Sequence, residues 1–126
     1  MPGNDAPKID FSEWVSWSNR SSLLRSDGPW LGVYLWAHFK RPLSQPTKPY
    51  PNLPSQVIYV GETKDIDQRP LTREHHRIVH YRDTFPDDPD LVKLYLSVCR
   101  VRRFGAGYSS KKAKGVYSRL RVYTVH

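Results

Sequence analysis

Tyrosine, arginine and histidine side chains follow one another closely in the middle of the chain. Tyr59 stands near the end of an apolar run, Gly61 follows it, and the segment beyond carries Arg69, His75 and His76. Arginine pairs with a phosphate through two parallel hydrogen bonds, and histidine gains or loses a proton near neutral pH. A phenol, a guanidinium and an imidazole brought together therefore indicate a site that acts on a phosphodiester.

The charge of the chain indicates a polyanionic partner. Lysine and arginine total 20 against 12 aspartates and glutamates, which gives a net charge of +8 and a pI near 9.8. No acid follows Asp90, whereas nine cations do: Lys93, Arg100, Arg102, Arg103, Lys111, Lys112, Lys114, Arg119 and Arg121. Cations that neutralise phosphates release counterions, so we expect DNA as the partner. A basic protein without a nucleic-acid partner is the alternative.

The length and the apolar content place limits on the class of protein. A chain of 126 residues is predicted to be a single domain, 1–126. No apolar run approaches the roughly 20 residues that span a bilayer, and the first residues do not resemble a secretory signal, so we expect a cytoplasmic protein. The lone Cys99 excludes an internal disulfide and a zinc site with several cysteines, and it is predicted to be a buried apolar residue.

The first half of the chain is predicted to form a leader, a short helix and a strand. Residues 1–29 hold a loose leader and a helix over 11–17, which Asp10 can cap. The aromatic-rich run 30–39 reads as a strand, and Gly32 near its start marks a bulge or a close approach by another group.

Residues 41–54 form a proline-rich insertion between two strands. The segment contains five prolines and is predicted to be an extended surface loop, because proline cannot donate to a strand ladder. A loop of this length is either functional or a tolerated addition. Contact with a partner protein through this loop would make the chain an interaction domain, which is a third possible function.

The second half is predicted to supply two more strands and two helices. The strand 56–60 ends at Gly61 and pairs antiparallel with 30–39. A helix over 65–81 has a loose first turn and becomes regular at Pro70, since proline is tolerated at the first helical position. A strand over 91–101 alternates with a period of two, and residues 113–126 read as a final helix. The expected class is α+β, with a small three-stranded antiparallel sheet flanked by helices.

Two tripeptides on the predicted strands resemble the motifs of a known family. Gly32-Val33-Tyr34 and Tyr59-Val60-Gly61 resemble the paired motifs of the GIY-YIG nuclease superfamily, and Arg69 matches the arginine that this family carries on the following helix. The resemblance covers roughly residues 30–101 and includes the order strand, strand, helix, strand. It implies a GIY-YIG-like fold.

The resemblance implies a metal-dependent DNA endonuclease. Tyr34 would be the general base that takes a proton from the attacking water, and Tyr59 would bond the nucleophile or a phosphate oxygen. Arg69 would hold the scissile phosphate, and a divalent metal, Mg²⁺ in the simplest case, would steady the developing charge. Ordinary packing within the sheet is the alternative for both tyrosines.

The sequence leaves two candidates for the histidine of this site and adds three cations to it. At about 100° per residue, His76 falls on the helical face of Arg69, whereas His75 is nearer to the family's spacing, so both stay candidates. Three further residues are predicted to contact nucleic acid, namely Lys64, Arg73 and Arg77.

The chain lacks the metal-binding glutamate of the family. The family places a metal-binding glutamate on a helix after the third strand, but this sequence has no glutamate after Glu74 and ends at His126. Either the chain is cut short, or it lacks the usual ligand and is a non-catalytic, basic nucleic-acid-binding module. Glu62 and Glu74 are the acids near the motif that could replace the missing carboxylate.

Overall fold

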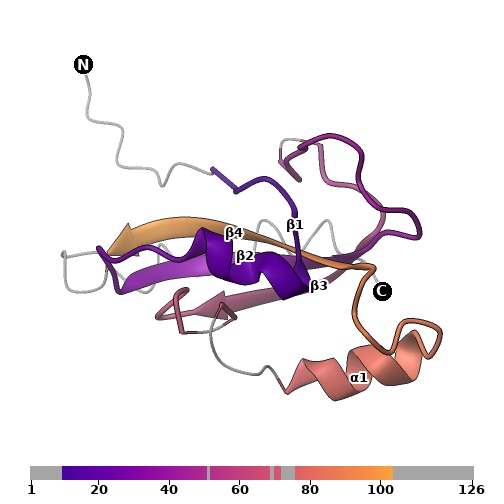
Figure 1. Cartoon of the computed structure of the whole chain (residues 1–126). Helices are drawn as coiled ribbons and strands as arrows, with labels where there is room; N and C mark the ends of the chain where they lie inside the picture. The colour runs from indigo at the N-terminus through magenta and orange to yellow at the C-terminus, as the bar shows by residue number, and fades with distance from the viewer. Residues whose placement is uncertain (1–9, 51, 69, 72–75, 104–126) are drawn as a thin grey trace.

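The protein is built on a four-stranded antiparallel sheet with the strand order β1-β4-β2-β3. The computed structural model describes residues 10–50, 52–68, 70–71 and 76–103. The elements are, in chain order, β1 (Val15–Ser16), the 3-10 helix η1 (Trp17–Leu23), β2 (Trp30–His38), β3 (Val57–Thr63), α1 (Arg77–Thr84) and β4 (Leu94–Arg103) (Figure 1). The predicted α+β class is confirmed, and the predicted count of three strands is wrong.

The central hairpin joins β2 to β3, as predicted, but β3 is longer than expected. Gly61 does not end the strand, because it stays in the ladder opposite Tyr34, and Thr63 still pairs with Gly32. A glycine in a strand interior usually marks a bulge or a close backbone approach. The pairing of β2 with β4 shifts its register between Leu31 and Gly32, so the predicted irregularity at Gly32 is confirmed.

The predicted helix over 11–17 is wrong, because this segment is extended. Phe11 bridges to Cys99, and Val15 and Ser16 pair with β4 as the fourth strand. Without this segment the outer edge of β4 would expose a row of unpaired backbone groups. The only helix that the structure describes in the predicted region 1–29 is η1, which starts at Trp17.

The predicted helix over 65–81 is also wrong in its bounds. Residues 66–68 and 70–71 are in turns, and α1 begins at Arg77. Ile66 and Leu71 are 0% and 2% exposed, so burial of these side chains fixes the segment across the sheet and overrides helix propensity. The helical phase that favoured His76 over His75 therefore does not apply across this segment. The predicted helix 113–126 lies outside the described residues.

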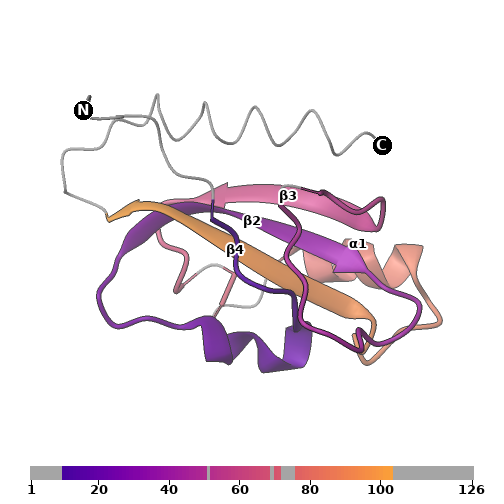
Figure 2. The same cartoon turned by 90° about the horizontal axis from the view of Figure 1, so that it is seen from above.

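The sheet separates two apolar cores. One core lies beneath η1, the turns at 66–68 and 70–71 and α1, and it includes Tyr34, Trp36 and three side chains of β4 at alternate positions. The other core lies on the opposite face, where part of the proline-rich loop packs against it through Leu43 and Leu53. Figures 1 and 2 show α1 on one side of the sheet and this loop at the end of the β2–β3 hairpin. The loop therefore covers core and is not merely a tolerated addition.

Cys99 belongs to the second core and is 0% exposed, and burial raises the pKa of its thiol. The prediction that Cys99 is a buried apolar residue is confirmed. No helix among the residues described here is long and apolar enough to cross a bilayer.

Candidate functional site

Tyr34 lies directly over Gly61 on the neighbouring strand. The two residues are cross-strand partners, and the Tyr34 side chain is only 2% exposed. A Cβ atom added at Gly61 would come within 2.3 Å of Tyr34 Cζ and 2.5 Å of its hydroxyl oxygen. The aromatic ring thus occupies the space that a side chain at Gly61 would need. The tyrosine of one tripeptide and the glycine of the other form a single steric unit.

Tyr59 lies on the same face of the sheet as Tyr34. The centroids of the two phenol rings are 6.0 Å apart, and Tyr59 also packs edge-on against Trp36 at 5.5 Å. The β2–β3 register shifts between Trp36 and Ala37, which leaves Ile58 without a partner in β2. Ile58 and Tyr59 therefore both contact the core beneath α1. The bulge thus places two consecutive side chains of β3 on the same core.

Arg77 adds a guanidinium to the two phenols. Its Cζ atom lies 4.9 Å from the centroid of the Tyr59 ring, within the range of a cation–π contact. Arg77 is an exposed residue at the start of α1, whereas Tyr59 is half-buried. A phosphate that approaches this point can meet a cation and a phenol together. A phenol and a guanidinium thus lie together here through Arg77, whereas the predicted contact with Arg69 lies outside the described residues.

The other predicted site residues divide into two groups. His76 directly precedes α1 and Lys64 directly follows β3, and both are exposed. Arg69, Arg73 and His75 lie outside the described residues, so their predicted roles stay predictions.

A second glycine contact fixes the turn that follows β3. A Cβ atom at Gly32 would lie 2.5 Å from the backbone oxygen of Cys99 and 2.6 Å from Ile66 Cγ1. The backbone N–H of Ile66 donates to the Trp30 oxygen at 3.0 Å, and Thr63 Oγ1 accepts from the Asp65 N–H at 3.1 Å. Ile66 is therefore seated on β2, and the chain leaves β3 in one fixed direction.

A partly buried ion pair lies next to this turn. Arg100 donates to Asp67 Oδ1 at 2.6 Å and to the Leu23 oxygen at 2.7 Å, and the two charged side chains are 11% and 16% exposed. The Arg25 backbone N–H donates to the same Asp67 oxygen at 3.0 Å. Arg100 is thus committed to holding the fold, although the sequence counted it among the cations available to a polyanion. No local pattern pairs two residues so far apart in sequence.

The described carboxylates do not make a metal site beside the tyrosines. Glu62 pairs with Val33, whose side chain lies in the opposite core, so Glu62 points away from Tyr34 and Tyr59. Within the described part of the chain, no group of three or more histidine, cysteine, aspartate or glutamate side chains is arranged to hold a metal ion. Glu74 lies outside that part. The side chains present here therefore do not fit a divalent metal by themselves.

Asp88 organises the segment between α1 and β4. It is 1% exposed and accepts hydrogen bonds from the Tyr81 hydroxyl, the Val92 N–H at 2.9 Å and the Lys93 N–H at 3.0 Å. Burial by itself would raise the pKa of the Asp88 carboxyl, but these hydrogen bonds outweigh burial and lower it. Burial and the bond to Asp88 raise the pKa of Tyr81. The backbone oxygen of Asp88 accepts from the Leu91 N–H at 3.2 Å, and Leu91 has a φ of 60°, which a leucine rarely adopts.

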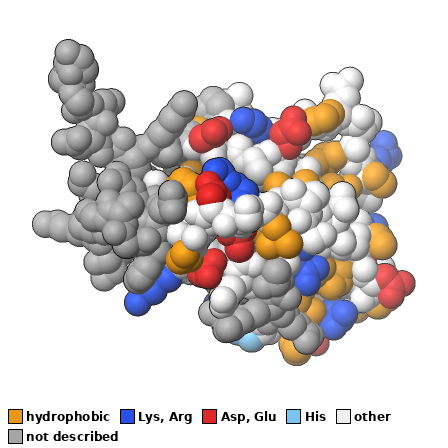
Figure 3. Space-filling view, turned by 60° about the vertical axis from the view of Figure 1, so that its left-hand side comes forward, with side chains coloured by type: hydrophobic (Ala, Val, Ile, Leu, Met, Phe, Trp, Pro, Cys, Tyr) orange, Lys and Arg blue, Asp and Glu red, His pale blue; other side chains and the backbone are white. Residues whose placement is uncertain are grey.

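The positive charge of the chain is unevenly divided. The described residues hold twelve of the 20 lysines and arginines and ten of the 12 acids, so their net charge is only +2. Figure 3 shows a face on which acidic and basic side chains are interspersed rather than gathered by sign. Most of the excess charge therefore belongs to residues outside the described part.

Comparisons of this chain with protein-family models, with curated proteins and with solved structures find no match. The resemblance to the GIY-YIG superfamily thus rests on the two tripeptides and their placement on β2 and β3.

Proposed function

We propose that this chain is a GIY-YIG-like, metal-dependent endonuclease domain that hydrolyses phosphodiester bonds in DNA. The observation that carries the proposal is the contact of Tyr34 with Gly61, next to Tyr59 and Arg77. Two phenols and a guanidinium on one face of a sheet match the chemistry of phosphate binding and proton transfer.

Four residues have distinct roles in this proposal, and one of them, Arg69, lies outside the described residues. Arg77 holds a phosphate through its forked donors while its flat face stays on the Tyr59 ring. The Tyr59 hydroxyl donates to a second phosphate oxygen. Tyr34, as its phenolate, takes the proton of the attacking water and becomes a neutral phenol, and water must reach an oxygen that is now buried. Arg69 holds the scissile phosphate, as the resemblance implies.

The metal in this proposal rests on the resemblance alone. Mg²⁺ would supply charge neutralisation at the phosphate, but the described residues do not provide its ligands. The residues named above bind and orient the phosphate in either case.

A second function is a nucleic-acid-binding module without catalysis. The burial of Tyr34 at 2% exposure favours it, as does the position of Glu62 on the opposite face. This module would keep the phosphate-binding chemistry of Tyr59 and Arg77 and the positive charge of the chain.

Nicking of a supercoiled plasmid in the presence of Mg²⁺ tests the proposal and separates it from the second function. The intact chain is expected to nick the plasmid, and Tyr34→Phe and Arg69→Ala are each expected to reduce the rate at least about 100-fold, the range of a lost proton-transfer group. Tyr50→Phe and Arg82→Ala are matched controls, since both residues are exposed and lie outside the site. DNA binding without nicking would favour the module, and nicking unchanged in both site variants would refute the assignment of these residues.

A further inference from the structure

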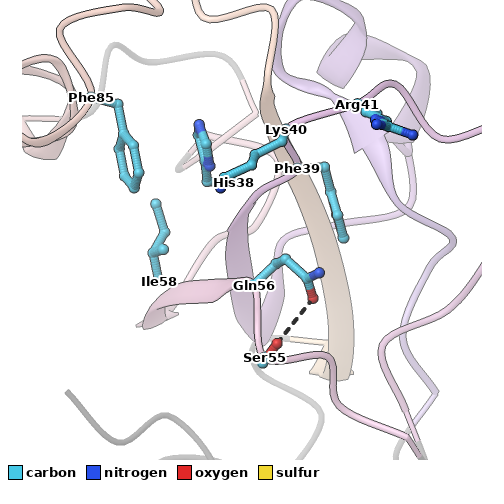
Figure 4. Close-up of a pocket in the computed structure, with 8 residues that line it drawn as sticks. All are labelled: His38, Phe39, Lys40, Arg41, Ser55, Gln56, Ile58 and Phe85. Atoms are coloured by element: carbon cyan, nitrogen blue, oxygen red, sulfur yellow. Dashed lines mark hydrogen bonds between the residues drawn. The ribbon is translucent and has the colours of Figure 1, made fainter.

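A pocket of about 600 Å³ opens at the end of the β2–β3 hairpin, away from Gly32. Its lining residues come from the end of β2, the start of β3, the intervening loop and the end of α1, and include His38, Lys40, Arg41, Gln56, Ile58 and Phe85 (Figure 4). Its volume is in the range of small-molecule sites, which combine apolar walls with a few placed polar groups.

The apolar wall of the pocket is held in place by the sheet and by α1. His38 stacks on Phe85 with ring centroids 4.0 Å apart and an interplanar angle of 11°. The His38 backbone N–H donates to the Gln56 oxygen at 3.0 Å, and the Phe39 N–H donates to the Lys93 oxygen at 3.0 Å. The wall is therefore preformed, and a ligand does not have to order it.

A carboxamide stands at the edge of this wall. Gln56 is exposed, and its Oε1 accepts from Ser55 Oγ at 3.4 Å, as the dashed line in Figure 4 marks. This weak bond leaves both N–H groups of the amide to a ligand. A carboxamide offers a donor and an acceptor side by side, which is the pattern that pairs with the edge of a nucleobase.

Two cations complete the lining. Lys40 and Arg41 are both exposed, and neither forms an ion pair with any other residue in the described ranges. In Figure 4 the Lys40 side chain extends toward His38, whereas Arg41 points outward at the rim. An anionic group of a ligand would thus be neutralised at the mouth of the pocket.

The pocket and the tyrosine site share one face of the molecule. Ile58 lines the pocket, and its neighbour Tyr59 contacts Arg77 at the start of α1. Phe85 follows the end of the same helix, whose eight residues span about 12 Å. At about 3.4 Å per nucleotide, a strand of three or four nucleotides covers this distance.

From these observations we infer that the pocket binds one unpaired nucleotide of a nucleic-acid strand. The base would lie against Ile58 and the exposed part of Phe85, with its edge at Gln56 and its phosphate at Lys40. A paired base cannot enter such a pocket, because its ring faces are stacked and its edge is occupied. The inference rests on the proposed function, since it assumes that a strand crosses the face at Tyr59.

Binding of the intact chain to three probes tests this inference. The probes are a blunt DNA duplex, the same duplex with a single-stranded overhang, and a free nucleoside monophosphate, each measured by fluorescence anisotropy or competition. The overhang is expected to bind roughly tenfold more tightly than the blunt duplex, the effect of one stacked base. Lys40→Gln and Gln56→Ala are expected to reduce that preference to less than about threefold while leaving duplex binding close to that of the original protein.

Matched controls come from the same loop. Lys48→Gln and Gln45→Ala change the same residue types outside the pocket and are expected to keep the preference. Duplex binding with no preference for the overhang would overturn the pocket and leave the proposed function intact. Absence of binding to either DNA would overturn both, and binding of the free nucleotide without a preference for the overhang would overturn the assignment to a strand.

Discussion

The two ends of β2 are built in different ways. At the first end, Ile66 is seated on Gly32 and Tyr34 covers Gly61, so that neighbouring atoms fill the space above both glycines. At the other end, beyond the bulge at Ile58, the hairpin strands lead into a long loop and leave a pocket lined by His38 and exposed cations. We call these the packed end and the open end.

The packed end has a fixed geometry, whereas the open end is accessible to a ligand. At the packed end, shape determines where the phenol of Tyr34 lies, since a close-packed interior transmits any displacement. At the open end, polar and charged groups are accessible, and a change there is expected to alter binding rather than folding. The predictions that follow test this division, beginning with the largest expected effect.

The ion pair of the packed end is expected to matter far more than one at the open end. Asp67→Ala removes the carboxylate partner of Arg100, which is 11% exposed, and should lower the free energy of unfolding by about 2 to 4 kcal/mol. At the open end, the Asp87 side chain is 70% exposed and pairs with Lys93. Asp87→Ala should therefore leave the free energy of unfolding unchanged. Urea unfolding of both variants makes the comparison, and equal effects would contradict the division.

Adding a methyl group at Gly61 is expected to strain the packed end. Gly61→Ala should lower the free energy of unfolding by about 1 to 3 kcal/mol, because the new Cβ meets the ring of Tyr34 in a filled site. In a Tyr34→Leu background the same change should have a smaller effect, and urea unfolding of the four proteins gives the coupling energy.

Gly32→Ala is the matched control for this cycle. Its Cβ would meet the Cys99 oxygen and Ile66 rather than Tyr34, so its effect should be the same in both backgrounds. Additive effects of Gly61→Ala and Tyr34→Leu would show that the ring does not depend on the glycine.

Acid is expected to act on the open end through Asp88. The pKa of Asp88 is lower in the folded state than in the unfolded state, so its carboxylate stabilises the fold at pH values above about 3.9. This stabilisation is lost as the pH falls below that value and through the folded-state pKa.

Asp88→Asn should therefore lower the free energy of unfolding by about 1 to 2 kcal/mol at neutral pH, and the difference from the original protein should shrink in acid. Denaturant unfolding at several pH values measures the change. Asp90→Asn, an exposed position in the same turn, is the control. A difference that stays constant with pH would contradict the role of Asp88.

The strands were the part of the fold that local pattern could predict. Continuous aromatic and β-branched runs marked β2 and β3, and a period of two marked β4, since such residues suit the buried surface of a sheet. Segments whose structure depends on distant partners were predicted wrongly. Residues 11–17 become extended because β4 needs an edge partner, and Ile66 and Leu71 are fixed by the core rather than by helix propensity.

For the site, the sequence indicated the two strands that carry the tyrosines and not the contacts around them. The two tripeptides lie on the paired strands β2 and β3, as predicted, but the cross-strand pairing of Tyr34 with Gly61 comes from the structure and was not predicted. The pairing of Asp67 with Arg100 and the bonds of Asp88 depend on tertiary contacts, and no spacing in the sequence indicates them. The pocket at the open end could not be predicted either, because it is formed by a stacked pair, His38 and Phe85, from different elements.

The central claim, that the face carrying Tyr59 and Arg77 binds nucleic-acid phosphate, is tested most directly by the salt dependence of DNA binding. The measurement is the Kd of the intact chain for a duplex over a range of salt concentrations, for the original protein, Arg77→Gln and Arg82→Gln. Arg82 lies on the same helix and is also exposed, so it controls for the loss of one charge.

We expect binding that weakens steeply with salt. Arg77→Gln should weaken it several-fold and reduce the slope of log K against log salt by about 1, the value for one lost phosphate contact, whereas Arg82→Gln should change the slope by less than half as much. Binding that is indifferent to salt, or equal losses in the two variants, would contradict the claim.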